Sequence, residues 1–106
     1  MAEQTIQWDG KAGKTYKYWI YRIGQQLKAV PGNYVFAKET ESNRFRPIYV
    51  GETANLSERF DNHHKMDCIK ANGATHICAH VNETGEANRR AEEQDIIAKW
   101  NPVCNG

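Results

Sequence analysis

Residues 31 to 60 read PGNYVFAKETESNRFRPIYVGETANLSERF and contain two segments of strand-like composition. These two apolar segments, residues 33–38 and 47–51, are rich in aromatic and β-branched side chains, which favour β-strands. The polar residues 39–46 between them predict a long hairpin loop. Because strands joined by a hairpin pair antiparallel, the stretch predicts the start of an antiparallel sheet.

Helix signals follow the second of these strands. Thr53 or Asn55 can cap a helix. That helix would run from Leu56 toward His64, with Leu56 and Phe60 four residues apart on its apolar face. Farther out, hydrophobic periodicity and end signals predict four more elements. They are strands at residues 16–23 and 75–81, and helices at residues 66–72 and 85–100.

This order of elements predicts an α+β fold, in which a small antiparallel β-sheet of three to four strands is flanked by helices. A chain of 106 residues has the size of one domain. We expect residues 31–105 to form its core and residues 1–30 to form an N-terminal extension with one added strand. The polar residues 1–15 are expected to be a loose leader or an edge segment.

Composition restricts the compartment and the partners. No apolar run approaches the roughly 20 residues needed to cross a membrane, and the first residues lack the pattern of a secretion signal. The odd number and scattered spacing of Cys68, Cys78 and Cys104 argue against a disulfide framework. We therefore expect a soluble, cytoplasmic protein with reduced thiols. Since the net charge is only +1, a phosphate-binding surface must come from local clustering of cations.

One carboxylate interrupts the apolar stripe of the last predicted helix. Glu93 shares a helical face with Ile96, Ile97 and Trp100. A carboxylate in that position is costly unless a cation or hydrogen bonds satisfy it. Its neighbour Glu92 lies off this stripe and is expected to face solvent. An ion pair at the rim of the core is the structural alternative for Glu93.

Four further side chains complete a candidate site. Arg59 interrupts the first predicted helix and His63 follows it by one turn, whereas Tyr34 and Tyr49 lie on the two strands of the hairpin. The structural alternatives are an arginine whose stem covers apolar surface and tyrosines that pack in the core. Together with Glu93, however, these side chains supply the groups that phosphodiester hydrolysis needs.

Each of these groups has a chemical reason to be there. A carboxylate can hold Mg²⁺, which prefers oxygen ligands and lowers the pKa of water. A guanidinium offers a planar fork that matches phosphate oxygens. A phenol or an imidazole can take a proton from the attacking water.

The ordered motifs resemble those of the GIY-YIG nuclease family. GNY at residues 32–34 and YVG at residues 49–51 are similar to the paired signatures that name the family. Arg59 lies ten residues after Tyr49, as the helix arginine of the family does, and His63 follows it by one turn. EQDIIAKWNPVCN at residues 93–105 resembles the C-terminal block of the family, which begins with a metal-binding glutamate and ends in an asparagine after a proline.

The resemblance covers residues 31–105 and implies a metal-dependent endonuclease that uses one Mg²⁺ or Mn²⁺. It implies that Glu93 is the metal ligand, that Arg59 neutralises phosphate charge and that His63 binds phosphate or assists proton transfer. Either Tyr34 or Tyr49 would be the general base. Two positions would support the site, namely Gly51 and Asn105. Nucleic acid is the implied partner, DNA rather than RNA, with a protein partner as a source of specificity and no membrane.

The sequence departs from the family pattern in three places. Asn33 replaces the isoleucine of the first motif, and the predicted hairpin loop is somewhat long. Glu52 stands where several members carry a lysine near the reacting phosphate. An acid at that position is expected to repel phosphate or to recruit a cation.

Two rival interpretations belong to other classes. The chain could keep the fold without turnover and serve as a module that binds nucleic acid or a protein, which Glu52 and the low net charge favour. It could also hold a structural zinc ion. In the strand at residues 75–81, one face is predicted to carry His76, Cys78 and His80, and the other face Ile77, Ala79 and Val81. A zinc site needs about four ligands, so one strand supplies only part of such a set.

Overall fold

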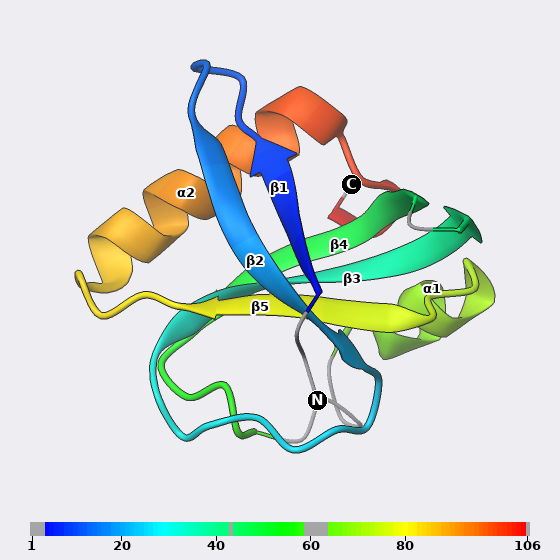
Figure 1. The fold of residues 1–106 in the computed structure, drawn as a ribbon. Coiled ribbons are helices and arrows are strands. Elements are labelled where there is room, and N and C mark those ends of the chain that lie inside the picture. Colours follow the sequence, from blue (N-terminus) through cyan, green and yellow to red (C-terminus); the bar gives the residue numbers. More distant parts are fainter. Residues whose placement is uncertain (1–3, 43, 59–63, 106) are drawn as a thin grey trace.

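The computed structural model describes residues 4–42, 44–58 and 64–105. Within them the chain forms a curled five-stranded antiparallel sheet in the order β1-β2-β5-β3-β4 (Figure 1). Its elements are β1 (Thr5–Asp9), β2 (Thr15–Arg22), β3 (Gly32–Glu41), β4 (Arg44–Thr53), α1 (Met66–Ala71), β5 (His76–Val81), α2 (Glu86–Trp100) and the short 3-10 helix η2 (Val103–Asn105). The predicted α+β class is confirmed, but the prediction of three to four strands is wrong.

The additional strand is β1, which pairs with β2 from Thr5 opposite Trp19 to Asp9 opposite Thr15. Its Trp8 side chain is almost fully buried in the core. A large aromatic side chain buries enough apolar surface to hold a short strand in place. Residues 5–9 are therefore a paired edge strand, one of the two forms predicted for this segment.

The β3–β4 hairpin is longer than predicted, and its loop is correspondingly short. The two strands remain paired as far as Glu41 opposite Arg44, and Phe45 lies opposite Glu39. The long loop predicted at residues 39–46 is therefore wrong. Polar side chains at the end of a hairpin face solvent on a ladder that the backbone hydrogen bonds continue to hold.

β5 lies between β2 and β3, and its side chains alternate between the two faces of the sheet as predicted. A separate core lies on each face. Ile77 and Ala79 face the first core, which α1 covers with Met66 and Ile69. The second core lies under α2, around Ile96. Its members are Trp8, Tyr18, Ile20, Val35, Ala37, Val50, Cys78 and Ile96. The sheet is thus covered by α1 on one face and by α2 on the other.

The helix predicted from Leu56 toward His64 is not formed where the structure can test it. Residues 56–58 make a turn and a bend, His64 lies in a turn, and residues 59–63 are outside the described part of the chain. Leu56 nevertheless packs as predicted, because it is buried against the backbone of Gly32. Within the described residues, neither α1 nor α2 is long and apolar enough to cross a membrane.

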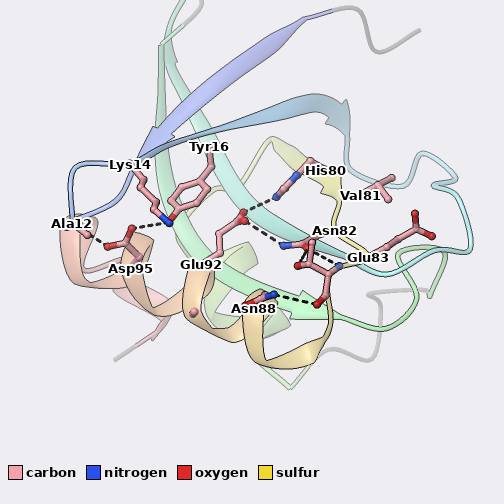
Figure 2. A pocket seen from close by; sticks show the side chains of 12 residues that line it. Ala12, Lys14, Tyr16, His80, Val81, Asn82, Glu83, Asn88, Glu92 and Asp95 are labelled. Atoms are coloured by element: carbon pink, nitrogen blue, oxygen red, sulfur yellow. Dashed lines mark hydrogen bonds and ion pairs between the residues drawn. The ribbon is translucent and has the colours of Figure 1, made fainter.

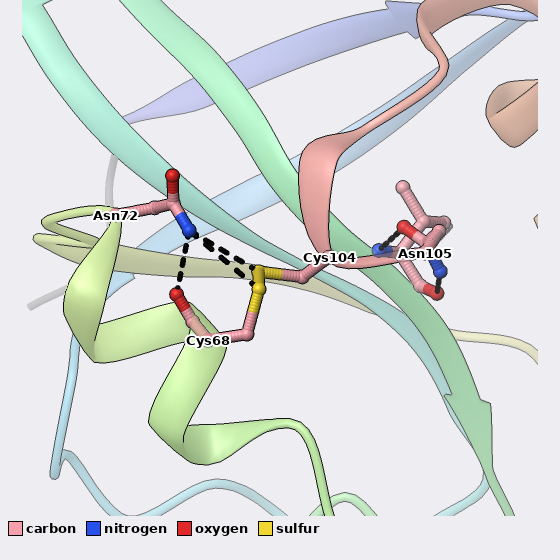
Figure 3. Close-up of a disulfide and its surroundings, with 5 residues drawn as sticks. Cys68, Asn72, Cys104 and Asn105 are labelled. Atoms are coloured by element: carbon pink, nitrogen blue, oxygen red, sulfur yellow. Dashed lines mark hydrogen bonds between the residues drawn. A yellow bond between two sulfur atoms is a disulfide. The ribbon is translucent and has the colours of Figure 1, made fainter.

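The cysteines correct the prediction of reduced thiols. Cys68 on α1 and Cys104 on η2 form a disulfide across 36 positions of sequence, with Cα atoms 5.9 Å apart (Figure 3). The side-chain amide of Asn72 lies beside both sulfur atoms. Cys78 remains a free thiol, and burial raises its pKa to about 12. The disulfide was missed because a spacing in sequence does not show which cysteines meet in space.

Candidate active site

The two hairpin tyrosines form one wall of the candidate site. Their ring centroids are 6.3 Å apart, with the ring planes inclined by 33°. Tyr34 is only 4% exposed and meets Phe36 edge to face. Tyr49 is half-buried, and its ring lies 6.2 Å from that of the exposed His64. One phenol is therefore inside the fold and the other reaches its surface.

Gly51 allows the Tyr34 side chain to lie where it does. A Cβ atom on Gly51 would stand 2.5 Å from both Cζ and Oη of Tyr34, closer than nonbonded atoms come. The phenol thus crosses directly over the backbone of β4. This close approach gives the glycine of the YVG motif a physical role in positioning Tyr34.

Glu93 on α2 acts electrostatically on both phenols. Burial, then the charges of Tyr49 and Glu93, raise the pKa of Tyr34 well above its ordinary value of 10.0. Burial, then the charge of Glu93, also raises the pKa of Tyr49. Three of the five predicted catalytic residues are thereby close enough to interact, although they come from β3, β4 and α2.

The carboxyl group of Glu93 is only partly compensated by its surroundings. Burial raises its pKa above 4.5, and the nearby charge of Glu52 adds to this effect. The side-chain amide of Gln94, at 3.4 Å, and the charge of Arg90 oppose it. Among the described residues, no lysine or arginine forms an ion pair with Glu93. The structural alternative of an ion pair is therefore not realised by this part of the chain.

Glu52, the main departure from the family pattern, is paired with arginine. Its carboxylate lies 3.0 Å from Nε of Arg89 and 3.9 Å from Nε of Arg90. The Arg89 side chain is almost fully buried, so this contact is shielded from solvent. The pair directs the charge of Glu52 toward α2. The carboxylate is therefore much less able to repel phosphate than the sequence alone predicts.

Two asparagines tie the site to the rest of the fold. Asn33 is completely buried and donates its side-chain amide to the carbonyl of Arg89, so it connects β3 to α2. Asn105 accepts a hydrogen bond from the Val50 amide at 2.8 Å and donates one to the Val50 carbonyl at 2.9 Å (Figure 3). Because β4 is an edge strand, Asn105 satisfies backbone groups that have no neighbouring strand. Asn105 thus holds β4 at Val50, next to Tyr49, whereas Asn33 holds β3 against α2.

The remaining predicted residues are Arg59 and His63, and both lie outside the described residues. The segment that carries them starts after Glu58 and ends before His64. The first described residue after this segment is His64, whose ring lies 6.2 Å from that of Tyr49.

The neighbouring carboxylate, Glu92, corrects another prediction. It is only 7% exposed, whereas the sequence predicts that it faces solvent. The hydroxyl of Tyr18 donates to its Oε2 at 2.6 Å. Nε2 of His80 lies 2.6 Å from the same oxygen (Figure 2). Asn82 donates to Oε1 at 3.3 Å. Burial and the charge of Glu92 together raise the pKa of Tyr18. Tyr18 therefore packs in the core, and its hydroxyl bonds to Glu92 rather than to water.

The error arises from the choice of helical stripe. The buried residues of α2 are Arg89, Glu92 and Ile96, at offsets of three and four. The predicted apolar stripe included Glu93 and Trp100 instead, yet Trp100 is 40% exposed. The offset of four between Glu92 and Ile96 was the available signal. It was hidden because two charged residues occupy core positions that are normally apolar.

An open cleft of about 700 Å³ borders this buried network. Tyr16 and Asp95 line it, and the Tyr16 hydroxyl donates to the Asp95 carboxylate at 2.7 Å (Figure 2). Burial and this hydrogen bond raise the pKa of Tyr16 to about 12. Since the phenols and carboxylates of this region bind one another, the cleft resembles a satisfied structural network more than a reactive site.

The structure also bears on the zinc alternative. His80 is engaged with Glu92, Cys78 is buried, and His76 hydrogen-bonds to Thr75. Across residues 4–42, 44–58 and 64–105, no group of three His, Cys, Asp or Glu side chains is arranged to hold a metal ion.

Comparison with known proteins gives no independent assignment. No protein-family model, no curated protein and no solved structure matches this chain. The resemblance to the GIY-YIG nucleases therefore depends on the motifs and on the geometry described above.

Proposed function

We propose that this protein is a metal-dependent endonuclease of the GIY-YIG type that hydrolyses phosphodiester bonds, in DNA rather than RNA. One observation carries the proposal. Tyr34, Tyr49 and Glu93 are far apart in sequence, yet they interact electrostatically at one edge of the sheet. Strongly perturbed titratable groups from separate elements are typical of functional sites.

The donor set at Glu93 fits a single Mg²⁺ or Mn²⁺ ion. Mg²⁺ is usually held by one or two carboxylates, while waters and substrate phosphates complete its coordination. Glu93 offers a hard oxygen donor in partly buried surroundings, and Glu52 is engaged with Arg89. When bound, the metal would supply charge stabilisation at the phosphate and lower the pKa of water. A cation beside Glu93 would also compensate the charge that raises the pKa of both phenols.

The two tyrosines take different roles in this proposal. Tyr49 is the general base, because it is half-buried and can reach a substrate at the surface. A phenol whose pKa is raised is seldom ionised at neutral pH, so a cation held by Glu93 would help Tyr49 to act as a base by favouring its phenolate. Tyr34 is almost fully buried and orients Tyr49 from the core side. Arg59 would neutralise phosphate charge, and His63 would bind the phosphate or assist proton transfer.

A nucleic-acid or protein-binding module without turnover is the second candidate. The raised pKa of both phenols favours it, because neither is prepared as a base in the absence of a cation. The ion pair of Glu52 with Arg89 removes one of the sequence-based arguments for it.

Cleavage of end-labelled DNA distinguishes the two candidates. Single-stranded, duplex and branched substrates are incubated with Mg²⁺ or Mn²⁺ and the wild type, Glu93→Gln or the control Glu83→Gln, which changes an exposed glutamate. We expect metal-dependent cutting that falls by at least about 100-fold in Glu93→Gln and is unchanged in the control. No cutting of any substrate by folded wild type would support the binding module instead.

A further inference from the structure

An aromatic and basic surface lies on the face of β2 that is opposite to α2. Lys17, Trp19 and Tyr21 alternate along the strand and therefore project from the same face. Trp19 is 39% exposed, which is unusual for so large an aromatic side chain. The ammonium group of Lys17 lies 5.2 Å from the centre of the Trp19 ring.

These side chains line a shallow groove of about 520 Å³. Lys28 enters it from the chain between β2 and β3, and Leu27, Leu56, Ala79, His80 and Val81 complete its wall. No aspartate or glutamate is among these lining residues. The groove is therefore locally positive and aromatic, although the whole chain is close to neutral.

The geometry points to a binding site for single-stranded nucleic acid on this surface, the β2 groove, formed by Lys17, Trp19, Tyr21 and Lys28. Exposed aromatic rings bind single strands by stacking on unpaired bases, and neighbouring cations track the phosphates. In a duplex the base faces are already stacked, so an exposed indole has no equivalent partner there. The occupant is therefore a single strand, and the duplex is the comparison in the test.

The β2 groove shares a sheet face with the tyrosines of the candidate active site. Trp19 on β2 pairs with Ala79 on β5, and Ala79 pairs with Tyr34 on β3. Tyr34 pairs in turn with Gly51 on β4. Paired residues in adjacent strands project to the same face, about 4.8 Å apart. Trp19 and Tyr34 are thus separated by two strand spacings, or about 10 Å. A single nucleic-acid strand bound at Trp19 would extend over Leu56 toward Tyr49.

This position next to the tyrosines gives the β2 groove a role as substrate guide, and that part of the inference rests on the proposed nuclease function. The binding of single-stranded nucleic acid by the β2 groove does not depend on that function. The groove is built mainly from the N-terminal extension, outside the segment that resembles the nuclease family. It would supply the local cluster of cations that the net charge of the chain does not provide.

Binding is measured without cleavage, by fluorescence anisotropy of a labelled oligothymidine of about 12 nucleotides in EDTA. We expect Trp19→Ala to weaken binding about tenfold, and Trp19→Phe to keep most of the affinity because it retains a stacking ring. Lys17→Gln is expected to reduce the slope of log affinity against log salt by about 0.7, the loss of one single-strand phosphate contact. Lys99→Gln, an exposed lysine on α2, is the charge-matched control and should leave affinity and slope unchanged.

Two results would overturn the inference. One is equal affinity of folded Trp19→Ala and wild type, and the other is an equal loss of affinity for a hairpin duplex of the same length. The nuclease proposal fails separately. If the wild type binds the oligonucleotide through Trp19 but cuts no DNA, the inference about the β2 groove stands and the nuclease proposal is wrong. If the wild type cuts DNA and the Trp19→Ala variant binds and cuts equally well, the nuclease proposal stands and the inference about the β2 groove is wrong.

Discussion

Two neighbouring glutamates on α2 meet opposite environments. Glu92 faces the core, where a tyrosine, a histidine and an asparagine bind its two oxygens. Glu93 is rotated by about 100° around the helix and faces the edge of the sheet. There its pKa is raised, and two phenols lie within its electrostatic reach.

The difference separates a carboxylate with a full set of partners from one that is only partly compensated. A buried charge contributes to stability only when its oxygens are satisfied, as those of Glu92 are. A partly buried carboxylate without a full set of partners retains capacity for a cation or a substrate, and this describes Glu93. Burial alone does not predict the role, because the more deeply buried Glu92 is the less available of the two.

The largest effect is expected when the Glu92 network is broken. Glu92→Ala leaves the Tyr18 hydroxyl and His80 without their partner, so we expect a loss of about 3 kcal/mol in the free energy of unfolding. Urea unfolding monitored by circular dichroism measures it. Glu83→Ala serves as the exposed control. A loss below about 1 kcal/mol would show that water replaces the carboxylate, and Glu92 would then not be structural.

A second, smaller loss of stability is expected when Gly51, on the Glu93 side of the molecule, is replaced. In Gly51→Ala the new methyl group overlaps the Tyr34 ring, which is enclosed by Phe36 and Tyr49 and must move. We expect a destabilisation of about 2 kcal/mol, measured in the same urea experiment. In a Tyr34→Phe background the hydroxyl contact disappears but the ring contact at Cζ remains, so most of the loss should persist. An unchanged stability would mean that Tyr34 does not cross over Gly51.

Local patterns predicted those parts of the fold that depend on neighbours in sequence. The hairpin strands, the alternation along β5 and the long helix α2 follow from periodicity and turn residues. The sequence also selected Tyr34, Tyr49 and Glu93, which the structure brings within electrostatic reach of one another. Gly51 and Asn105 were assigned supporting roles, and their contacts with Tyr34 and Val50 give those roles a physical basis.

The parts that were missed depend on partners distant in sequence. β1 is held by the burial of Trp8, and the disulfide requires α1 and η2 to meet, so neither follows from local pattern. Glu92 was assigned to solvent because its partners Tyr18 and His80 come from β2 and β5. A polar residue at a core position can be interpreted only when the residues facing it are known.

Titration of the phenols tests whether the charge of Glu93 acts on Tyr49. Replacing the charge of Glu93 by the neutral amide in Glu93→Gln removes one cause of the raised pKa of Tyr49. We expect the pKa of Tyr49 to fall but to stay above 10.0, because burial is the larger cause and is unchanged. NMR of ring-labelled tyrosine, assigned with Tyr49→Phe, measures the shift. The pKa of Tyr18, which is raised by burial and by Glu92, should not move. An unchanged pKa of Tyr49 would place Glu93 away from the site.

The smallest effect is expected on the stability of the Glu93→Gln variant itself. A carboxyl group whose pKa is higher in the folded chain than in the unfolded one stabilises the fold below pH 4.5, and this contribution is lost as the pH rises through the folded value. Wild type should therefore lose stability relative to Glu93→Gln as the pH rises through this range. At neutral pH we expect Glu93→Gln to be equal to or more stable than wild type, by no more than about 0.5 kcal/mol.

Urea midpoints at acidic and neutral pH, with Glu92→Gln as the matched variant, provide the measurement. Glu92→Gln is expected to destabilise at neutral pH, because an amide cannot accept hydrogen bonds at both of its terminal atoms. If Glu93→Gln destabilises the fold as much as Glu92→Gln does, both glutamates are structural. The separation between a satisfied carboxylate and an available one would then fail, and with it the reason to assign the metal to Glu93.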